Sequence, residues 1–598
     1  MSKKIKKSLA ENPVKANTIS AAPINFVIQP TQINYIFCAI IALIGLIIYA
    51  NTYNHGFVLD DTAAITRNLF VQKGLAGIPE ILKSDFWYFS NAKLGYYRPL
   101  GLITFAIEYQ LFGLNSTVSH INNIILYSLS GFLLTVLLQK WFSDRNKFFA
   151  FFVGLIFITH PIHTEVVANI KSRDEILGFL FTVSSLLLHW KYLETSKIKF
   201  LIFGLLTMYF ALLSKETSFV GIGILAISLY FIAKKSIGQS IIGILPYFGV
   251  VIVFFIQKNA LIGKGVVPND IVNYVYASEN TKFLSTFKLF FYYLRLLVLP
   301  HPLVYDYSYN VLPSGKISDW MTILGLFSFL VIFYFALKSL KTRSTFGFGL
   351  FLLLVTSAPA LGFVFLRGGI LAERFMYAPV LAFAILIMLG FEKLMKVDFA
   401  DKSTELVEWT NKNLVLIGVI AILTGLYSFK TITRNPDWKD EITLYRSGYE
   451  YHKNSAQILR HLGYEKVLNA YNAYKDPAKA KKFGEEGLVY YRKALAIHPN
   501  FGDVLHQVGY IHHFYTSRPD SAKYYYKLAT TYAPNMAENY NNLGLLYLSE
   551  QKNDIASYYF NRAMQVNPNF ADARNNHQAI KNATGLDVKF LSEQQLNQ

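Results

Sequence analysis

Apolar residues fall in long runs over the first 430 positions, and short polar loops separate these runs. Many runs reach about 17–20 residues, the length that an α-helix needs to cross ~30 Å of hydrocarbon. About eleven membrane helices are predicted, near 33–50, 121–140, 148–162, 176–193, 199–213, 217–233, 240–257, 320–338, 346–366, 374–392 and 412–430. Residues 431–598 are polar and have helical periodicity, so we expect an all-α chain in which a polytopic membrane bundle, 33–430, precedes a second helical domain.

Lysine and arginine collect in alternate loops of the predicted bundle. The N-terminal tail, 1–32, holds five lysines, and further basic clusters follow the second, fourth, sixth, eighth and tenth predicted helices. The positive-inside rule assigns all of these to the cytosol. A cytosolic start and an odd number of spans then place residues 431–598 on the outer side.

Two apolar segments are predicted to lie within outer loops. Phe283 to Leu299 is apolar enough to cross, but a crossing there would move the basic cluster Lys338 to Arg343 outside. We therefore expect an amphipathic or re-entrant helix inside a long outer loop, 258–319. Leu100 to Leu111 is too short to cross, and it is expected to lie along the outer surface within the first outer loop, 51–120.

The C-terminal domain repeats a pattern of small and large residues. Gly544, Ala556, Phe560 and Ala563 precede Pro568, and the same frame occurs upstream before Pro534 and, more weakly, before Pro499. The prolines recur at about 34 residues, which is the period of tetratricopeptide repeats. Residues 431–598 are therefore predicted to form a tetratricopeptide-repeat α-solenoid of about three repeats, near the minimum for a stable array.

Composition narrows the class of protein further. The 598 residues are 53% hydrophobic and include 49 Phe and 40 Tyr, which excludes an ordinary soluble protein. Cytosolic basic loops and anionic lipid explain the net charge of +19 better than nucleic-acid binding does. The single cysteine, Cys38, excludes a disulfide framework. The first apolar run is too long for a cleaved signal peptide and is expected to remain as a helix.

Charged and histidine side chains in or beside apolar segments are costly and tend to be functional. With the predicted topology, all such residues fall on the outer side, and they are Asp60, Asp61, Arg98, His120, His160, His163, Glu165, Arg173, Asp174, Glu175, Lys215, Glu216, Arg295, Asp306, Arg367, Glu373 and Arg374. Carboxylates that face several cations at one membrane surface suit a reaction between a charged lipid-linked substrate and an outer partner.

Each of these groups also has a plainer interpretation. The acidic pair fits a solvated turn, the Lys215-Glu216 pair fits a turn between helices, and Glu373 with Arg374 fits a local ion pair. His160, His163 and Glu165 are residue types that bind Zn²⁺, but Pro161 interrupts their helical spacing. Helix capping or substrate hydrogen bonding is favoured there. A divalent metal is an alternative that we do not favour, and no cofactor is predicted.

An ordered series of short motifs spans nearly the whole chain. It comprises Phe57-Val58-Leu59-Asp60-Asp61, Tyr97-Arg98-Pro99-Leu100, His160-Pro161-Ile162-His163-Thr164-Glu165, Leu213-Ser214-Lys215-Glu216, Tyr293-Leu294-Arg295, Asp306-Tyr307-Ser308, Ala372-Glu373-Arg374 with Tyr377, and Arg434-Asn435 with Trp438. In these motifs the chain resembles the transmembrane and tetratricopeptide-repeat O-mannosyltransferases and, more broadly, the GT-C superfamily of glycosyltransferases.

The resemblance implies an inverting transfer of a sugar, expected to be mannose, from a polyprenyl phosphate to Ser or Thr hydroxyls of exported proteins. A carboxylate in the first outer loop would act as general base, and Asp60 is favoured over Asp61. Fixed cations would bind the donor phosphate, in the order Arg374, Lys215, Arg295 and Arg98. The residues assigned to the sugar or the acceptor are His160, His163, Glu165, Glu216, Asp306, Glu373 and Tyr377.

The predicted partners are a polyprenyl-phosphate-sugar donor, membrane lipids and a polypeptide acceptor gripped by the repeats, with no nucleic acid. The alternative role for the repeats is structural or in oligomerisation. Rival functions are transfer to a glycolipid or polysaccharide, and a non-enzymatic membrane scaffold. A transporter is disfavoured because the polar residues avoid the midplane. The expected location is a bacterial inner membrane with the repeats in the periplasm, or the endoplasmic reticulum with the repeats in the lumen.

Overall fold

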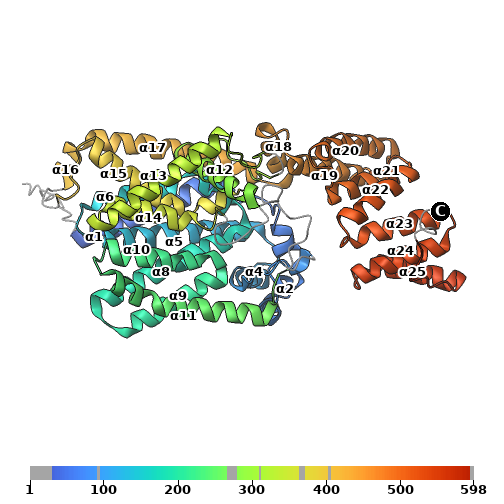
Figure 1. The fold of residues 1–598 in the computed structure, drawn as a ribbon, viewed down its shortest axis with the longest axis horizontal. Coiled ribbons are helices and arrows are strands. Elements are labelled where there is room, and N and C mark those ends of the chain that lie inside the picture. Colours follow the sequence, from blue (N-terminus) through green and yellow to red (C-terminus); the bar gives the residue numbers. More distant parts are fainter. Residues whose placement is uncertain are drawn as a thin grey trace, which may run out of the picture.

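The computed structural model describes residues 30–90, 94–265, 279–308, 311–361, 371–401 and 406–592 (Figure 1). Within these ranges every regular element is a helix, so the prediction of an all-α chain is confirmed for the described residues. The predicted cytosolic tail lies outside them up to residue 29. Parts of the predicted loop 258–319 and the end of the predicted helix 346–366 lie outside them as well.

A helix forms at each of the eleven positions that the apolar pattern predicts. They are α1 (Pro30–Tyr49), α5 (Ser116–Trp141), α6 (Lys147–Thr159), α8 (Arg173–Thr195), α9 (Ile198–Ser214), α10 (Val220–Phe231), α11 (Ile237–Ile262), α13 (Trp320–Thr342), α14 (Thr345–Ser357), α15 (Pro379–Leu394) and α17 (Leu414–Arg434). In the described chain, six helical stretches are long and apolar enough to cross a membrane, or seven if the bent pair Lys147–Thr159 and Pro161–Ala168 is one span. By length and composition this is a multi-pass membrane protein, while eleven spans stays a prediction.

The two segments expected in outer loops are also helical. α4 (Pro99–Phe112) packs against α9 and the short helices α2 (Leu69–Gln72) and α3 (Ile78–Ile81). α12 (Glu279–Val298) is one continuous helix that packs along α13. Whether α12 enters the membrane stays a prediction.

Polar residues fix the helix starts that flank the apolar runs. Asn146 accepts a hydrogen bond from the Phe148 N–H at 3.1 Å and so caps α6. Ser236 and Gln239 form a reciprocal capping box at the start of α11. Such caps satisfy N–H groups that have no partner within the helix.

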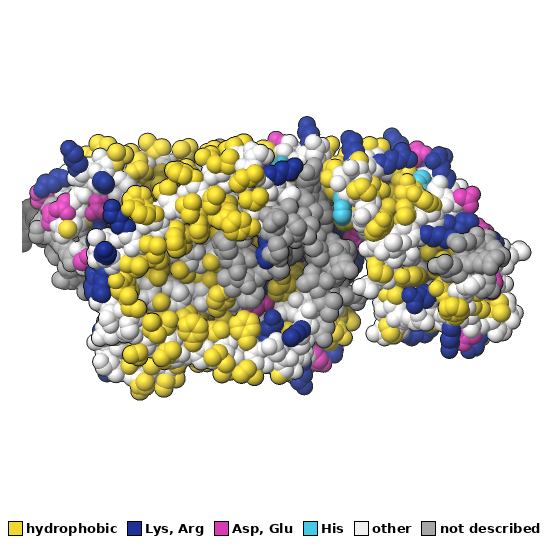
Figure 2. All heavy atoms as spheres, in the orientation of Figure 1, with side chains coloured by type: hydrophobic (Ala, Val, Ile, Leu, Met, Phe, Trp, Pro, Cys, Tyr) yellow, Lys and Arg dark blue, Asp and Glu magenta, His cyan; other side chains and the backbone are white. Residues whose placement is uncertain are grey.

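Loops that hold basic residues meet at one end of the bundle. Lys140, in the last turn of α5, pairs with Glu194 of α8 at 2.7 Å, and Arg145 pairs with Glu392 of α15 at 2.7 Å. Lys234, after α10, donates to a backbone carbonyl after α13 at 2.7 Å. Figure 2 shows charged side chains at the left end of the bundle beside a mainly apolar band. The opposite end of the bundle holds the candidate site.

Helical hairpins extend from that opposite end (Figure 1). Their helices are α18 (Glu441–Tyr451), α19 (Ala456–Asn472), α20 (Pro477–Ile497), α21 (Gly502–Phe514), α22 (Pro519–Tyr532), α23 (Ala537–Ser549), α24 (Asn553–Val566) and α25 (Ala571–Thr584). Neighbours in sequence pack in pairs, α19 with α20, α21 with α22, and α23 with α24.

A glycine in the first helix of each pair allows an aromatic ring of the second helix to approach. A Cβ atom on Gly509 would lie 2.8 Å from the ring of Tyr526, and one on Gly544 would lie 2.6 Å from that of Phe560. Gly463 meets Tyr491 in the same way. These are the small and large positions of the predicted repeat frame, and each pair of helices uses them for the same contact.

Candidate functional site

The acidic pair lies in a tight turn after α1, and its two carboxylates have different surroundings. Leu59 has φ of 48°, a left-handed conformation that costs a non-glycine residue about 1–2 kcal/mol. The buried Asp61 side chain braces this turn by accepting hydrogen bonds from the N–H groups of Val58 at 2.8 Å and Lys171 at 2.7 Å. Burial raises the pKa of the Asp61 carboxyl to about 7. Asp61 therefore ties the turn to the segment before α8.

Asp60 faces outward from the same turn, and its side chain is 41% exposed. The Lys171 ammonium, which is buried over the rings of Phe86 and Trp87, lies 3.8 Å from the Asp60 carboxylate. Lys171 is held in turn by Asp174 at 3.7 Å. The turn thus presents an accessible carboxylate beside a fixed cation.

Asp174, in the first turn of α8, collects cations from three separate segments. Besides Lys171, it pairs with Arg98 at 2.9 Å and with Lys215 at 3.6 Å. Arg98 also binds Glu216 at 2.7 Å, and all these side chains are buried. The guanidinium of Arg98, a predicted phosphate ligand, and the carboxylate of Glu216, a predicted sugar or acceptor ligand, are thus engaged with each other.

A second buried cluster surrounds Arg173. It forms an ion pair with Glu108 of α4 and donates to Asn123 Oδ1 at 2.7 Å and to the Ser119 carbonyl at 2.9 Å. These contacts hold α4 against α5 and α8. The sequence reasoning missed Glu108, although a lone carboxylate within the apolar run 100–111 was a visible signal.

Glu165 and Arg374 form an ion pair between segments that are 209 residues apart in sequence. Glu165 lies in α7 (Thr164–Ala168), and Arg374 lies in the short helix Glu373–Met376. The backbone N–H of Arg374 donates to one carboxylate oxygen of Glu165 at 2.8 Å, and the Arg374 guanidinium binds the other oxygen. The Arg374 side chain is 26% exposed whereas that of Glu165 is 2% exposed. Glu165, predicted as a sugar or acceptor ligand, therefore orients a partly accessible guanidinium.

The neighbouring Glu373 points in another direction. Its buried carboxylate accepts from the Tyr307 hydroxyl at 2.7 Å and from the Val304 N–H, which ties the loop after α12 to this segment. In the same loop, Asp306 accepts from the Ser308 N–H at 2.9 Å and hydroxyl at 2.6 Å. Burial raises the pKa of the Asp306 carboxyl above its usual value.

The two predicted histidine ligands are buried in the bundle behind the site. His160 Nε2 lies 3.0 Å from the Leu297 carbonyl, and His163 Nδ1 lies 2.9 Å from the Tyr127 hydroxyl. His163 also packs edge-on against Tyr377, with ring centroids 4.8 Å apart. Within the described residues, no group of three or more His, Cys, Asp or Glu side chains lies close enough together to hold a metal ion.

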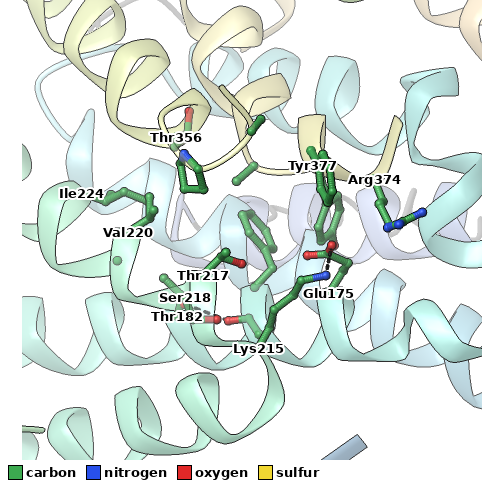
Figure 3. Close-up of a pocket in the computed structure, with 17 residues that line it drawn as sticks. Glu175, Thr182, Lys215, Thr217, Ser218, Val220, Ile224, Thr356, Arg374 and Tyr377 are labelled. Atoms are coloured by element: carbon green, nitrogen blue, oxygen red, sulfur yellow. Dashed lines mark hydrogen bonds and ion pairs between the residues drawn. The ribbon is translucent and has the colours of Figure 1, made fainter. Parts of the chain in front are cut away.

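An inner cavity opens between α8, α10, α14 and the segment that follows α14 (Figure 3). Its polar end is lined by Glu175, Lys215 and Arg374, and Figure 3 shows Lys215 and Glu175 pointing toward one another. Its wall continues along Phe179 and Ile224, which are apolar. Tyr377 belongs to the same lining. The cavity therefore combines an end that holds two cations and a carboxylate with a mainly apolar wall.

An outer cavity of about 500 Å³ lies beside it. The membrane bundle lines it with Asp60, Asp306 and Arg374, and the first C-terminal helices line it with Tyr445 and Arg460. Arg374 belongs to the linings of both cavities, so its guanidinium lies where they adjoin. The sequence reasoning missed the contribution of α18 and α19, because nothing in the repeat pattern distinguishes the hairpin nearest the membrane.

Arg295, the third predicted phosphate ligand, lines neither cavity. Arg295, near the end of α12, donates to the His301 carbonyl at 2.8 Å and packs over the ring of Tyr292. Of the four predicted cations, only Lys215 and Arg374 line the inner cavity.

Comparison with known proteins identifies relatives over about three quarters of the chain. It is 28% identical over 450 residues to a protein O-mannosyl-transferase of Caenorhabditis elegans, F38B6.6, covering 74% of this chain and 61% of that protein. It is 26% identical over 550 residues to the protein O-mannosyl-transferase tmtc2 of Xenopus laevis, covering 77% and 62%. It is 27% identical over 522 residues to human TMTC1, covering 79% and 56%. The chain thus spans only about three fifths of the length of these curated relatives.

Two further comparisons also gave matches. Residues 522–580 match a family model described as the Est1 DNA/RNA binding domain. A crystal structure of ArnT from Cupriavidus metallidurans bound to undecaprenyl phosphate superposes with a TM-score of 0.37 at 14% identity, covering 85% of this chain and 81% of that one. The resemblance indicated by the ordered motifs is confirmed at the level of sequence, because this chain is similar to the curated protein O-mannosyl-transferases.

Proposed function

We propose that this chain is a membrane glycosyltransferase of the GT-C type, which transfers a sugar from a polyprenyl phosphate to hydroxyl groups of a polypeptide. The observation that carries the proposal is the position of Arg374, which lines an amphipathic inner cavity and also an outer cavity that contains Asp60. The names of the relatives support mannose as the sugar and protein as the acceptor.

The inner cavity suits the lipid-linked donor. The polyprenyl tail packs along Phe179 and Ile224, and the phosphate approaches the guanidinium of Arg374 and the ammonium of Lys215. Arginine binds phosphate through paired N–H groups, so it fixes the orientation of the leaving group as well as its charge. With the phosphate at Arg374, the sugar extends into the outer cavity.

Asp60 supplies the base in this scheme. Its carboxylate takes the proton of the acceptor hydroxyl as the oxygen attacks the anomeric carbon, and the bond from that carbon to the phosphate oxygen breaks. The polyprenyl phosphate leaves with the electron pair, and the configuration at the anomeric carbon is inverted. A carboxylate beside the ring also stabilises the oxocarbenium character of the transition state. Asp61 has a structural part in this scheme, because both of its oxygens are engaged with the backbone.

The proposal extends to the arrangement of the whole chain. Residues 1–32 form a cytosolic tail, 33–430 the transferase domain with its outer loops 51–120 and 258–319, and 431–598 a tetratricopeptide-repeat solenoid that presents the acceptor. The site and the hairpins face the periplasm of a bacterium or the lumen of the endoplasmic reticulum. The alternative acceptor is a glycolipid or polysaccharide, and the alternative class is a scaffold without activity.

The test is sugar transfer by purified protein from polyprenyl-phosphate-mannose to a library of peptides rich in Ser and Thr. We expect the Asp60→Asn variant to lower kcat about 100- to 10,000-fold, the usual contribution of a general base, while donor binding is kept. Asp144→Asn, which changes a carboxylate between α5 and α6, is the matched control and should keep full activity. Equal activity of Asp60→Asn and wild type would remove the base from the proposal. Transfer only to glycolipid would replace the acceptor, and a complete absence of transfer from any donor would favour the scaffold.

A further inference from the structure

The first two C-terminal helices, α18 and α19, pack against the membrane bundle through specific side-chain contacts. The Tyr305 hydroxyl lies 2.9 Å from His461 Nδ1 of α19, and the His461 ring stacks on Tyr445 of α18 with centroids 4.4 Å apart. Gly448 makes room for the Tyr305 ring, since a Cβ atom there would lie 2.6 Å from it. Side chains of α18 and α19 therefore keep a set position relative to the bundle.

The first outer loop is tied to the same junction. The Gly56 N–H donates to the Lys439 carbonyl at 2.8 Å, just before α18. The Asn51 side chain donates to the Ile432 carbonyl of α17 at 3.0 Å. Because the turn that presents Asp60 and the start of the hairpins share these contacts, the two walls of the outer cavity are held together.

One face of α19 lines the outer cavity with groups that form hydrogen bonds. Gln457, Arg460 and Tyr464 belong to this lining, and their spacing of three and then four residues places them on one side of the helix. Tyr464 is 40% exposed, and the Arg460 side chain is 26% exposed. Arg460 donates to Asp503 at 2.9 Å through Nη1, and its Nη2 lies 2.7 Å from His461 Nε2, whereas its buried Nε has no hydrogen-bond partner. The face therefore offers an amide, a guanidinium and a phenol along one line.

The length of this face matches a short stretch of extended polypeptide. Seven residues of α-helix rise about 10 Å, and an extended chain covers that distance in about three residues. We propose that Gln457, Arg460 and Tyr464 form an acceptor subsite that holds about three residues of an extended polypeptide beside the hydroxyl presented to Asp60. The inference rests on the proposed function, and it names the residues that select the acceptor.

The position and chemistry of the subsite favour a polypeptide over a lipid acceptor. α19 lies in the hairpins beyond the apolar band of the bundle (Figures 1 and 2). Peptide carbonyl and N–H groups recur along an extended chain and can pair with amide, guanidinium and phenol groups in turn. A lipid acceptor needs an apolar groove for its tail, and this face of α19 is polar.

The test compares two acceptors, N-acetylthreonine amide and a heptapeptide with threonine at its centre. We expect Gln457→Ala and Tyr464→Ala each to lower kcat/KM for the heptapeptide about three- to tenfold, mainly through KM, since each removes one or two hydrogen bonds. Transfer to N-acetylthreonine amide should not change. Tyr471→Ala is the matched control, because Tyr471 is an exposed tyrosine two turns further along α19 and is not part of the cavity lining.

A direct binding measurement separates this inference from the proposed function. The affinity of a fluorescent heptapeptide for wild type and for Tyr464→Ala is measured by anisotropy, which requires no turnover, and Kd should rise three- to tenfold in the variant. If wild type transfers to N-acetylthreonine amide, and the variants lose equal activity toward both acceptors or lose none, the subsite is overturned and the proposed function stands. If the heptapeptide binds in a way that depends on Tyr464 but no transfer occurs, the subsite is kept and the proposed function is overturned. Transfer to a glycolipid alone overturns the polypeptide assignment.

Discussion

The ion pair between Arg374 and Glu165 allows a structural role and a donor-binding role to be measured separately. Arg374→Ala removes the guanidinium that faces the buried Glu165 carboxylate. Removing one partner of a buried ion pair leaves an uncompensated charge, which costs about 3–5 kcal/mol of stability. A thermal unfolding transition in detergent should therefore fall markedly for this variant.

The double variant Arg374→Ala with Glu165→Gln should recover most of that loss. The glutamine carbonyl oxygen still accepts the hydrogen bond from the backbone N–H of residue 374, and no buried charge remains. Glu165→Gln alone serves as the second control. It keeps the guanidinium in place but takes away the carboxylate that orients it.

Donor affinity should not recover in the double variant. A hydrogen bond to a charged group contributes about 1.5–3 kcal/mol, so loss of the guanidinium should weaken binding of polyprenyl phosphate about 10- to 100-fold. Binding is measured by titration with a short-chain polyprenyl phosphate in nanodiscs. If the double variant binds the phosphate as wild type does, Arg374 has only a structural role and the reasoning that places the phosphate there is wrong.

Three further changes test other parts of the structure. Burial raises the pKa of the Asp61 carboxyl to about 7, so the native state binds the carboxyl proton more tightly than the unfolded chain does. The stabilisation from this proton is complete below about pH 4 and is lost as pH rises through 7. Asp61→Asn should remove this pH dependence from the unfolding temperature. Gly544→Ala forces a methyl group against an aromatic ring of α24 and should cost about 1–3 kcal/mol in a chemical denaturation curve, whereas Gly425→Ala, with open space around it, should not. Glu175→Gln removes one of the two carboxylates that pair with Lys215, leaving Asp174, and should tighten polyprenyl phosphate binding about three- to tenfold in the same titration.

The positions of the helices follow from the sequence because hydrophobic length and helix period are local properties. Each apolar run of the bundle became a helix, and the repeat frame of Gly544 and Phe560 marked a real contact between paired helices. Helix ends were less accurate, since they depend on caps and on neighbouring segments. The predicted helix 346–366, for example, ends at Ser357.

The partners of the charged residues were not predictable in the same way. Sequence marked Arg98 and Arg374 alike as cations at the outer side, but the structure surrounds Arg98 with two carboxylates and leaves Arg374 partly exposed between two cavities. The adjacent Asp60 and Asp61 likewise differ because the turn buries Asp61 against two backbone N–H groups and leaves Asp60 exposed beside Lys171. Such distinctions arise from contacts between segments that are remote in sequence, which one sequence without relatives does not reveal.

The pairing of the cations in the inner cavity has a consequence for turnover under the proposed function. Lys215 binds Glu175 and Arg374 binds Glu165, so neither cation meets the donor as a bare charge. A site of unpaired cations would bind both the donor phosphate and the released polyprenyl phosphate tightly, and the part of that binding energy already realised with the donor does not accelerate transfer. The negative charge on the phosphate grows only as the bond to the sugar breaks. Cations that are already paired with carboxylates stabilise this developing charge more than they stabilise the donor phosphate. When each cation pairs with its carboxylate again, the polyprenyl phosphate is released.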